Sequence, residues 1–475
     1  MTPTTLSDNI TRHDMVELGN VDLPEFGLPL HEPQLEAKEY ELRIDQVRRM
    51  METRRLDFLV VYGDREHFSN MEFLIGHDPR FEEAILVLNK RDIPLLILGN
   101  EGWGHSQHIP ITIERRLWQS LSLLGQPRGQ CKSLEDILRE AGIGAGMAGG
   151  VVGWKYFSET EFIKPQEVFE VPSFLIDTLR NIMGDGKLIN AGDLFVHVDN
   201  GLRCINSVNQ LARFEFTATH ASQAFRNALF HIKPGMTELE IVQEMRLPGL
   251  PLSCHIMVSA GPRAHIMLLS PTNRSVEIGD PFLGCVGMWG GASTRAGFIV
   301  ETASQLDSSI RDYIDKLVKP YFAAIVDWYE TIGIGVTGNE LYEAVHRHLG
   351  DPFFKVTLNP GHLIHTDEWV HSPVYRGSSH QLKAGTMIQV DVIPATGTPY
   401  FTSNLEDTVA LADTQMRVEF ATLYPEAWKR IQARRLFMQE VLGINLKPDV
   451  LPFSNIPAYL PPFLLAPHRA MHVKR

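Results

Sequence analysis

The sequence predicts a mixed α/β protein of two domains, and three observations support this. The chain has 475 residues, 44% of them hydrophobic and 21% charged, which is a globular composition at a length that suits two domains. Short apolar runs alternate with helical patterns in the first part of the chain, which favours an open α/β sheet. A helix, glycine turn, helix pattern occurs twice in the second part, at Gly235-Met236-Thr237 and Gly335-Val336-Thr337, which indicates a duplicated unit with internal pseudo-symmetry.

The first domain is expected at residues 35–198, after a polar N-terminal arm of residues 1–34. Period-2 and continuous apolar runs predict the strands, and apolar residues at helical spacing predict the helices. The sequence contains no glycine-rich nucleotide-binding motif that opens a helix here. The expected helices are Leu35–Glu52 and Leu134–Ala141, and the expected strands are Leu56–Gly63, Glu82–Asn89, Asp92–Gly99 and Gly149–Trp154.

The second domain is expected at residues 199–475. Helices are predicted at Leu211–His231 and Ser308–Thr331, each followed by a glycine turn and a second helix, with Thr237 as an N-cap. Strands follow each helix pair, and we expect two half-sheets that face one another across a polar gap. The tail of residues 444–475 combines prolines with large apolar residues, so we expect it to pack against the body or a partner.

Charge and hydropathy exclude several classes of function. Lys and Arg number 44 against 57 Asp and Glu, a formal net charge of −13, which argues against a nucleic acid or an anionic membrane as partner. The apolar runs are too short to span a bilayer, and the first residues lack the apolar core of a signal peptide. The 4 cysteines form no CxxC pair, so reduced thiols and a cytoplasmic location are expected.

The stretch from Asn359 to Asp407 concentrates the candidate functional residues. Imidazoles and carboxylates on neighbouring extended segments are what a metal site or an acid/base site needs. The expected catalytic residues are His362, His371, Asp391 and Glu406, and the expected substrate-binding residues include His365, Asp367 and Glu368.

Five segments resemble the creatinase, prolidase and aminopeptidase P family. The first domain carries LDFLVVYGDREHFSNMEFLIGHD, and the second carries LRCINSVNQLARFEFTATHASQAFRNAL, SAGPRAHIMLLSPTNRSVEIGD, GTMIQVDV and NLEDTVAL, in the family's order. The resemblance covers almost the whole chain. It implies a non-catalytic α/β domain of the creatinase type, followed by a pseudo-symmetric pita-bread domain.

The resemblance also implies positions for metal ligands. Peptidases of this family hold two divalent metals with an Asp, Asp, His, Glu, Glu set. Carried over to this sequence, those positions hold Cys285, Ala292, His362, Asp391 and Glu406. A thiol and a methyl group replace the two aspartates, so a bridged pair of hard cations is not expected. No cofactor is expected; if one divalent metal binds, His362, Asp391 and Glu406 would hold it.

The resemblance adds two substrate-side candidates. Arg295 matches the family's arginine, and His265 lies close to Leu268, where the family has a histidine. Both are expected to bind a small-molecule or dipeptide-like substrate.

The leading hypothesis is a hydrolase related to creatinase and the Xaa-Pro peptidases. It would cleave a C–N bond of a small molecule by acid/base chemistry, without a dinuclear metal centre. Two alternatives stay open: a non-catalytic binding protein with a pita-bread fold, and a single-metal lyase or aminopeptidase-like enzyme. We also expect a homodimer, because the arm and the tail are each too short to form a core of their own and the family resemblance points the same way.

Overall fold

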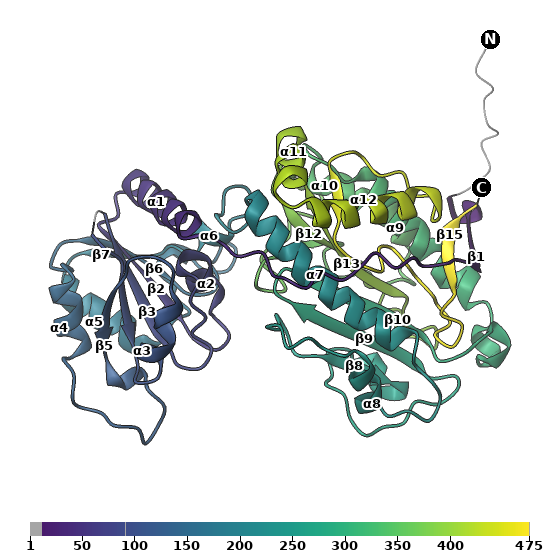
Figure 1. Ribbon diagram of the computed structural model, residues 1–475, viewed down its shortest axis with the longest axis horizontal. Helices are drawn as coiled ribbons and strands as arrows, with labels where there is room; N and C mark the ends of the chain where they lie inside the picture. Colours follow the sequence, from purple (N-terminus) through teal and green to yellow (C-terminus); the bar gives the residue numbers. More distant parts are fainter. Residues whose placement is uncertain (1–11, 91, 475) are drawn as a thin grey trace, which may run out of the picture. The chain divides into compact units, whose positions relative to one another are not determined.

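The computed structural model describes residues 12–90 and 92–474, so residues 1–11 of the predicted arm lie outside the described part. The chain divides into two compact units (Figure 1). Residues 34–203 form one, which we call the inserted unit. Residues up to 33 and from 204 onward form the other, which we call the discontinuous unit.

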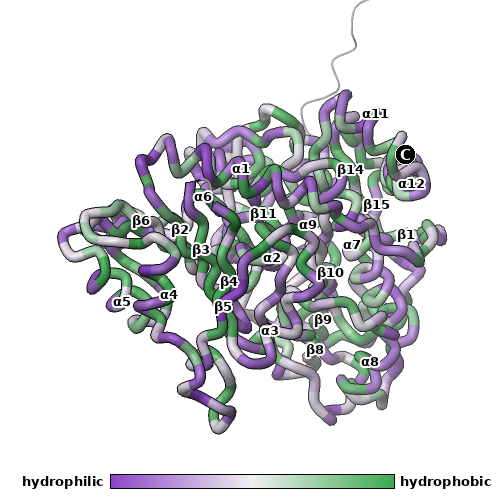
Figure 2. Tube along the Cα trace, turned by 60° about the vertical axis from the view of Figure 1, so that its left-hand side comes forward, coloured by the Kyte–Doolittle hydropathy of each residue, from purple (hydrophilic) through white to green (hydrophobic). Residues whose placement is uncertain are grey.

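The inserted unit is an α/β sheet of six strands in the order β5-β4-β3-β2-β6-β7. The strands β2 and β3 are mostly hydrophobic (Figure 2), and all their residues except Asn89 are buried because helices cover the sheet. Phe58, Val60 and Tyr62 alternate along β2 onto the face where the core also includes residues of α4 and α5. The helices are α1 (Ala37–Arg54), α2 (Ser69–Ile75), α3 (Gly102–His105), α4 (Leu134–Glu140), α5 (Ser173–Met183) and α6 (Asp193–Val196); the strands are β2 (Phe58–Gly63), β3 (Ala84–Asn89), β4 (Leu95–Leu98), β5 (Glu114–Leu117), β6 (Ala148–Val152) and β7 (Lys187–Asn190).

The discontinuous unit is built on a seven-stranded sheet with the path β11-β12-β13-β10-β9-β8, and β14 also pairs with β13. Helix α7 lies along β9 and β10 (Figure 1). The helices are α7 (Val208–Leu229), α8 (Glu238–Glu244), α9 (Lys319–Thr331), α10 (Gly338–Leu349), α11 (Thr414–Leu423) and α12 (Pro425–Glu440). The strands are β1 (Val16–Asn20), β8 (Met257–Ala260), β9 (Pro281–Met288), β10 (Gly291–Phe298), β11 (His362–Leu363), β12 (Met387–Asp391), β13 (Asn404–Leu411), β14 (Val450–Pro452) and β15 (Arg469–Val473).

The expectation of two half-sheets facing one another is wrong. Strand β10 pairs antiparallel with β13, through Thr294–Ala296 and Asn404–Glu406. This pairing joins the two halves into one continuous sheet. Polar residues from the two halves therefore meet on adjacent strands rather than across a gap.

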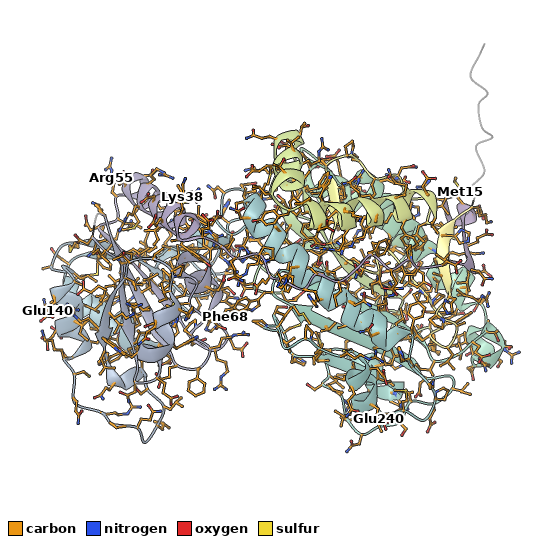
Figure 3. All side chains as sticks on the ribbon, viewed as in Figure 1. Met15, Lys38, Arg55, Phe68, Glu140 and Glu240 are labelled. Carbon is orange, nitrogen blue, oxygen red and sulfur yellow. The ribbon has the colours of Figure 1, made fainter. Side chains whose placement is uncertain are left out.

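The duplicated helix start is confirmed in detail. Gly235 and Gly335 adopt φ values of 89° and 85°, a conformation that glycine reaches without steric cost. Both following helices then begin with a capping box, formed by Thr237 with Glu240 and by Thr337 with Glu340. Glu240 lies on the exposed first turn of α8 (Figure 3).

The capping box of α10 gives a first testable result. Replacing Thr337 by Ala leaves the backbone N–H of Glu340 without the hydroxyl that it now contacts at 3.3 Å. We expect a loss of about 1 kcal/mol in the free energy of unfolding, measured by urea denaturation. Glu343→Ala, an exposed change on the same helix, is the control and should stay within about 0.5 kcal/mol of the parent. Equal effects of both changes would contradict the capping role.

The helix expected from Ser308 begins later than the sequence pattern suggests. A single turn at Ser308–Ile310 precedes a π-helical stretch at Ile314–Val318, and the α-helix starts at Lys319. Pro320 lies in its first turn, where its missing N–H costs nothing. Helices α2, α5, α11 and α12 had not been predicted.

The tail packs against the body of the same chain. Nearly all side chains from Val450 to Leu464 are buried, and β15 pairs with β1. In the described part of the arm, Glu32 also forms an ion pair with Arg213 at 2.8 Å. The structure thus provides partners for both segments within one chain. Across residues 12–90 and 92–474, none of the helices has the length and apolar character needed to cross a bilayer.

Candidate functional site

The sheet register brings several of the candidate polar residues onto neighbouring strands. Asp391 is directly opposite Glu406, Glu406 is opposite Thr294, and Thr294 is opposite Cys285. Directly opposite residues of antiparallel strands share a face, with Cβ atoms about 5 Å apart. One row across β12, β13, β10 and β9 therefore carries two carboxylates, a hydroxyl and a thiol.

His362 enters this row from the edge strand β11. It follows Gly361, whose φ is 121° and where an added Cβ would lie 3.0 Å from the carbonyl oxygen of Gln389. Only glycine fits that conformation and approach without strain. His362 is directly opposite Gln389 on β12, two residues before Asp391, and its side chain is fully buried.

The imidazole of His362 is surrounded by carboxylates. Its Nε2 lies 3.2 Å from Oε1 of Glu368, 3.8 Å from Oε1 of Glu406 and 3.9 Å from Oδ2 of Asp391. Trp369 stacks on the ring, with centroids 4.1 Å apart and planes 14° from parallel. The stacking fixes the ring plane, so Nε2 points into the carboxylate cluster.

Burial and mutual charge shift the pKa values of this cluster. Burial disfavours the imidazolium of His362, but the charges of Glu368, Asp391 and Glu406 outweigh it and raise the pKa of His362 to about 9. Burial, together with the charge of Glu406, raises the pKa of Asp391 to about 8. Partial burial likewise raises the pKa of Glu368 to about 7, against the effect of the imidazole. The cluster can therefore hold and release protons near neutral pH.

Two buried atoms in the cluster lack a well-formed hydrogen bond. Thr294 donates its hydroxyl to Oε2 of Glu406 at 2.6 Å, which orients this carboxylate. The other oxygen, Oε1, and Nε2 of His362 have no hydrogen-bond partner among the described residues. Buried polar atoms without partners are costly, so this point is suited to a ligand, a water molecule or an ion.

The other predicted imidazoles lie nearby in the chain but make different contacts. His365 is buried edge-on against Phe214, with centroids 4.8 Å apart, and its Nδ1 lies 3.2 Å from the hydroxyl of Thr366. His371 has its Nδ1 3.3 Å from the carbonyl oxygen of Ser372.

The two remaining candidates for substrate binding, Asp367 and His265, lie nearer the surface. Asp367 is half-buried beside Glu368, and its carbonyl oxygen accepts the backbone N–H of His365 at 3.1 Å. His265 is exposed and packs edge-to-face against Phe401, with centroids 5.1 Å apart.

Arg295 is not in the cluster, contrary to the expectation that it binds substrate. It follows Thr294 on β10, so its side chain points to the opposite face of the sheet. Its guanidinium is fully buried and contacts Asp407 at 2.8 Å. It also donates to the carbonyl oxygens of Tyr459 and Ile456 at 2.6 and 2.5 Å. Arg295 therefore anchors the C-terminal segment to the sheet.

The two positions matched to aspartates offer no carboxylate. Ala292 lies on β10, opposite Gly287 of β9. Cys285 is buried, and a hydrogen bond with Cys254, together with burial and the charge of Glu406, raises the pKa of its thiol. A protonated thiol is a poor ligand for a hard cation.

The sequence reasoning missed the roles of three residues. Thr294 orients Glu406, Trp369 fixes the ring of His362, and Cys254 contacts Cys285. Thr294 carried a signal because it directly precedes the arginine of the matched motif, and Trp369 carried one because it lies within the stretch Asn359–Asp407.

The chain is similar to known peptidases in sequence and in fold. Residues 213–413 match the model of metallopeptidase family M24. No protein with a curated function matches the sequence.

Three solved structures illustrate the likeness in fold. The dipeptidase PepE from Mycobacterium ulcerans is 17% identical with a TM-score of 0.58, covering 80% of this chain and 95% of that one. The Xaa-Pro dipeptidase from Bacillus anthracis is 15% identical with a TM-score of 0.59, over 79% and 96%. The prolidase from Pyrococcus furiosus is 14% identical with a TM-score of 0.57, over 77% and 96%.

These likenesses confirm the pita-bread fold, and the match of residues 213–413 to metallopeptidase family M24 agrees with the resemblance to the creatinase, prolidase and aminopeptidase P family.

Proposed function

We propose that the protein is a hydrolase that cleaves a C–N bond of a small molecule by acid/base chemistry at the His362 cluster. The observation that carries the proposal is a buried imidazole within 3.2–3.9 Å of three carboxylates. A buried site has no structural need for so many ionisable groups, since each is costly to desolvate. The family match supports a hydrolytic reaction.

The pKa values suggest a role for each group. Hydrolysis of a C–N bond needs a base that takes a proton from the attacking water and an acid that protonates the leaving nitrogen. Glu368, with a pKa of about 7 and a side chain 30% exposed, is the proposed base. His362, with a pKa of about 9, is protonated at neutral pH and is the proposed acid. Glu406, whose Oε1 lies 3.8 Å from Nε2, stabilises the imidazolium.

The donor set suits one divalent ion better than two. Within the described residues, His362, Glu368 and Glu406 each offer a ligand atom, all within 4.8 Å of one another. This trio has Glu368 in place of the predicted Asp391. Ala292 and Cys285 supply no carboxylate where a second ion would need one. A single bound ion would polarise the scissile group and lower the pKa of a bound water; the same three residues would hold it.

Metal content and hydrolysis, measured together, test this proposal. Protein purified without added metal is assayed on creatine-like, acylated-amine and Xaa-Pro compounds, with and without a chelator. After incubation with Mn²⁺, we expect at most one bound Mn²⁺ per chain, and a His362→Ala variant should lose it. Retained turnover in chelator supports the metal-free route, and its loss supports the single-ion route.

Two outcomes would overturn parts of the proposal. Two tightly bound Mn²⁺ ions per chain would refute the mononuclear donor set. Binding of these compounds without turnover of any of them would favour the alternative, a non-catalytic binding protein. The substrate-binding roles of Asp367, His365 and His265 stay predictions. So does the homodimer; it was expected because the arm and the tail are each too short to form a core, and in the structure both segments pack within one chain.

A further inference from the structure

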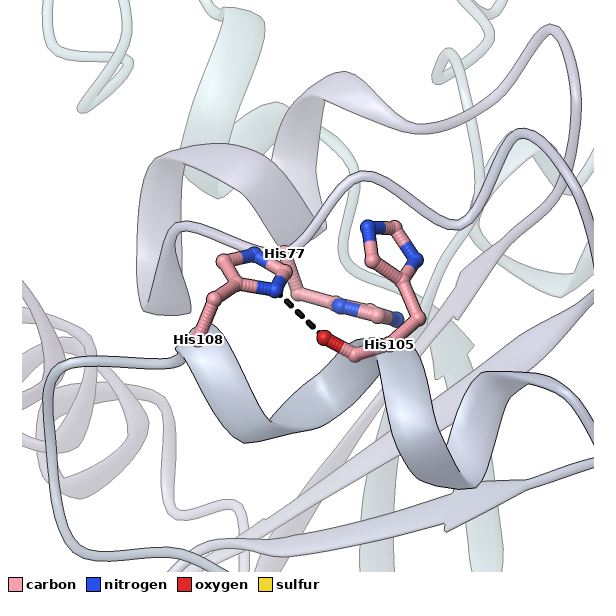
Figure 4. Close-up of side chains that lie close together, drawn as sticks. All are labelled: His77, His105 and His108. Atoms are coloured by element: carbon pink, nitrogen blue, oxygen red, sulfur yellow. Dashed lines mark hydrogen bonds between the residues drawn. The ribbon is translucent and has the colours of Figure 1, made fainter.

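A second cluster of side chains that could hold a metal lies in the inserted unit, outside the segment 213–413 that matches family M24. It contains His77, His105 and His108 (Figure 4). His77 directly follows Gly76, the left-handed residue that ends α2. His105 ends α3, and His108 ends the short 3₁₀ turn Ser106–His108. Two backbone reversals thus bring three imidazoles together.

We propose that His77, His105 and His108 bind one divalent transition-metal ion of the Zn²⁺ type. One nitrogen of each ring lies within 4.8 Å of the others. Ring centroids are 4.9 Å apart for His77 and His105, 5.6 Å for His77 and His108, and 4.8 Å for His105 and His108. Three imidazoles that coordinate a tetrahedral ion at about 2 Å place their ring centres roughly 5 Å apart. The observed ring spacing is therefore compatible with a shared ion.

The first independent observation is a buried nitrogen that lacks a partner. His77 has only 1% of its surface exposed. Its Nδ1 has no hydrogen-bond partner among the described residues. In the tautomer that carries its proton on Nε2, the ring has a buried lone pair at Nδ1. A buried lone pair without a donor favours a bound cation.

The second observation concerns His108, whose two ring nitrogens both face carbonyl oxygens. Nδ1 lies 2.5 Å from the oxygen of His105, and Nε2 lies 2.9 Å from the oxygen of Gly76. A neutral imidazole has a single N–H. If Nδ1 donates to His105, then Nε2 presents a lone pair to the oxygen of Gly76. A cation that binds Nε2 would take the place of this contact and requires the carbonyl of Gly76 to turn aside, while the Nδ1 hydrogen bond holds the ligand ring in place, as second-shell carbonyls do.

The chemistry of the donors selects the class of ion. Imidazoles favour zinc, copper, nickel and cobalt, whereas magnesium and calcium require oxygen ligands. His105 and His108 are exposed, so water can complete the coordination shell. Arg115 carries a positive charge near His77, which acts against a bound cation. Its guanidinium donates hydrogen bonds to the hydroxyl and the carbonyl oxygen of Ser106, at 2.9 and 2.8 Å. The ion would fasten the end of α2 to the α3 turn.

Zinc binding to the full-length chain tests the proposal. A His362→Ala background removes the other candidate donor set, and equilibrium dialysis then measures Zn²⁺ bound per chain at micromolar concentrations. We expect one Zn²⁺, with affinity falling at least about tenfold in His105→Gln and in His108→Gln. Both changes are at exposed positions, so the fold should persist. His197→Gln, in the same unit but outside the cluster, is the matched control and should bind as the background does.

A Co²⁺ titration gives a second readout that does not depend on activity. Tetrahedral Co²⁺ absorbs strongly in the visible range, and the band should be absent in His105→Gln. Zinc binding only at millimolar concentration, or binding unchanged in both histidine variants, would overturn the proposal.

Discussion

Replacing His362 by alanine should lower kcat by about 10²-fold or more, the usual scale for a general acid or base. The reason is that Nε2 of His362 lies 3.2–3.9 Å from three carboxylates. Without this imidazole, the carboxylates lose the group with which they exchange a proton. Glu406→Gln should give a similar loss, because it removes one of the charges that keep the imidazole protonated. Steady-state kinetics on the substrate identified by the screen measures both effects.

Folding controls separate a chemical role from a structural one. The melting temperature of each variant is measured, and His346→Gln, on the outer helix α10, serves as a histidine replacement away from the cluster. If the His362 and Glu406 variants fold and turn over substrate near the parent rate, the proposed placement of the active site is wrong.

Replacing Arg295 by methionine should destabilise the discontinuous unit by about 3–5 kcal/mol, the usual cost of leaving a buried charge without its partner. Asp407 would lose its 2.8 Å contact while remaining buried. Burial already raises the pKa of Asp407 even with Arg295 beside it. The free energy of unfolding from guanidinium denaturation measures the loss.

A double replacement isolates the cause. Arg295→Met combined with Asp407→Leu removes both charges, so we expect it to recover part of the lost stability, as replacement of buried ion pairs by apolar groups often does. Full recovery is not expected, because Arg295 also donates to carbonyl oxygens of Tyr459 and Ile456. An Arg295→Met variant as stable as the parent would show that Arg295 does not anchor the tail.

The contrast between Thr294 and Arg295 shows how far the sequence could predict this site. Apolar runs and glycine turns were enough to locate most strands and the duplicated helix starts. The face on which a strand residue lies depends on register, and one residue along β10 separates the hydroxyl that contacts Glu406 from the guanidinium on the other side. Register between β10 and β13 is a long-range property, so local patterns could not assign it.

Glu368 illustrates a second limit. Its place in a histidine- and carboxylate-rich stretch identified it as a candidate, but its contact with His362 depends on a turn that the sequence pattern did not reveal. Leu363 donates its N–H to the carbonyl of His371 at 2.7 Å, and Val370 donates to the carbonyl of Leu363 at 2.9 Å. These two bonds fold the loop back over β11. Hydrogen bonds of this kind have no periodic signature in the sequence.

The pairing of β1 with β15 has a consequence for the order in which the chain folds during synthesis. Val16 pairs with Val473, and Asn20 pairs with Arg469, so a strand made early must wait for one made near the end. The inserted unit is contiguous and can fold as soon as it leaves the ribosome. The unit that carries the candidate site can complete this strand pair only when nearly all of this sequence has been translated.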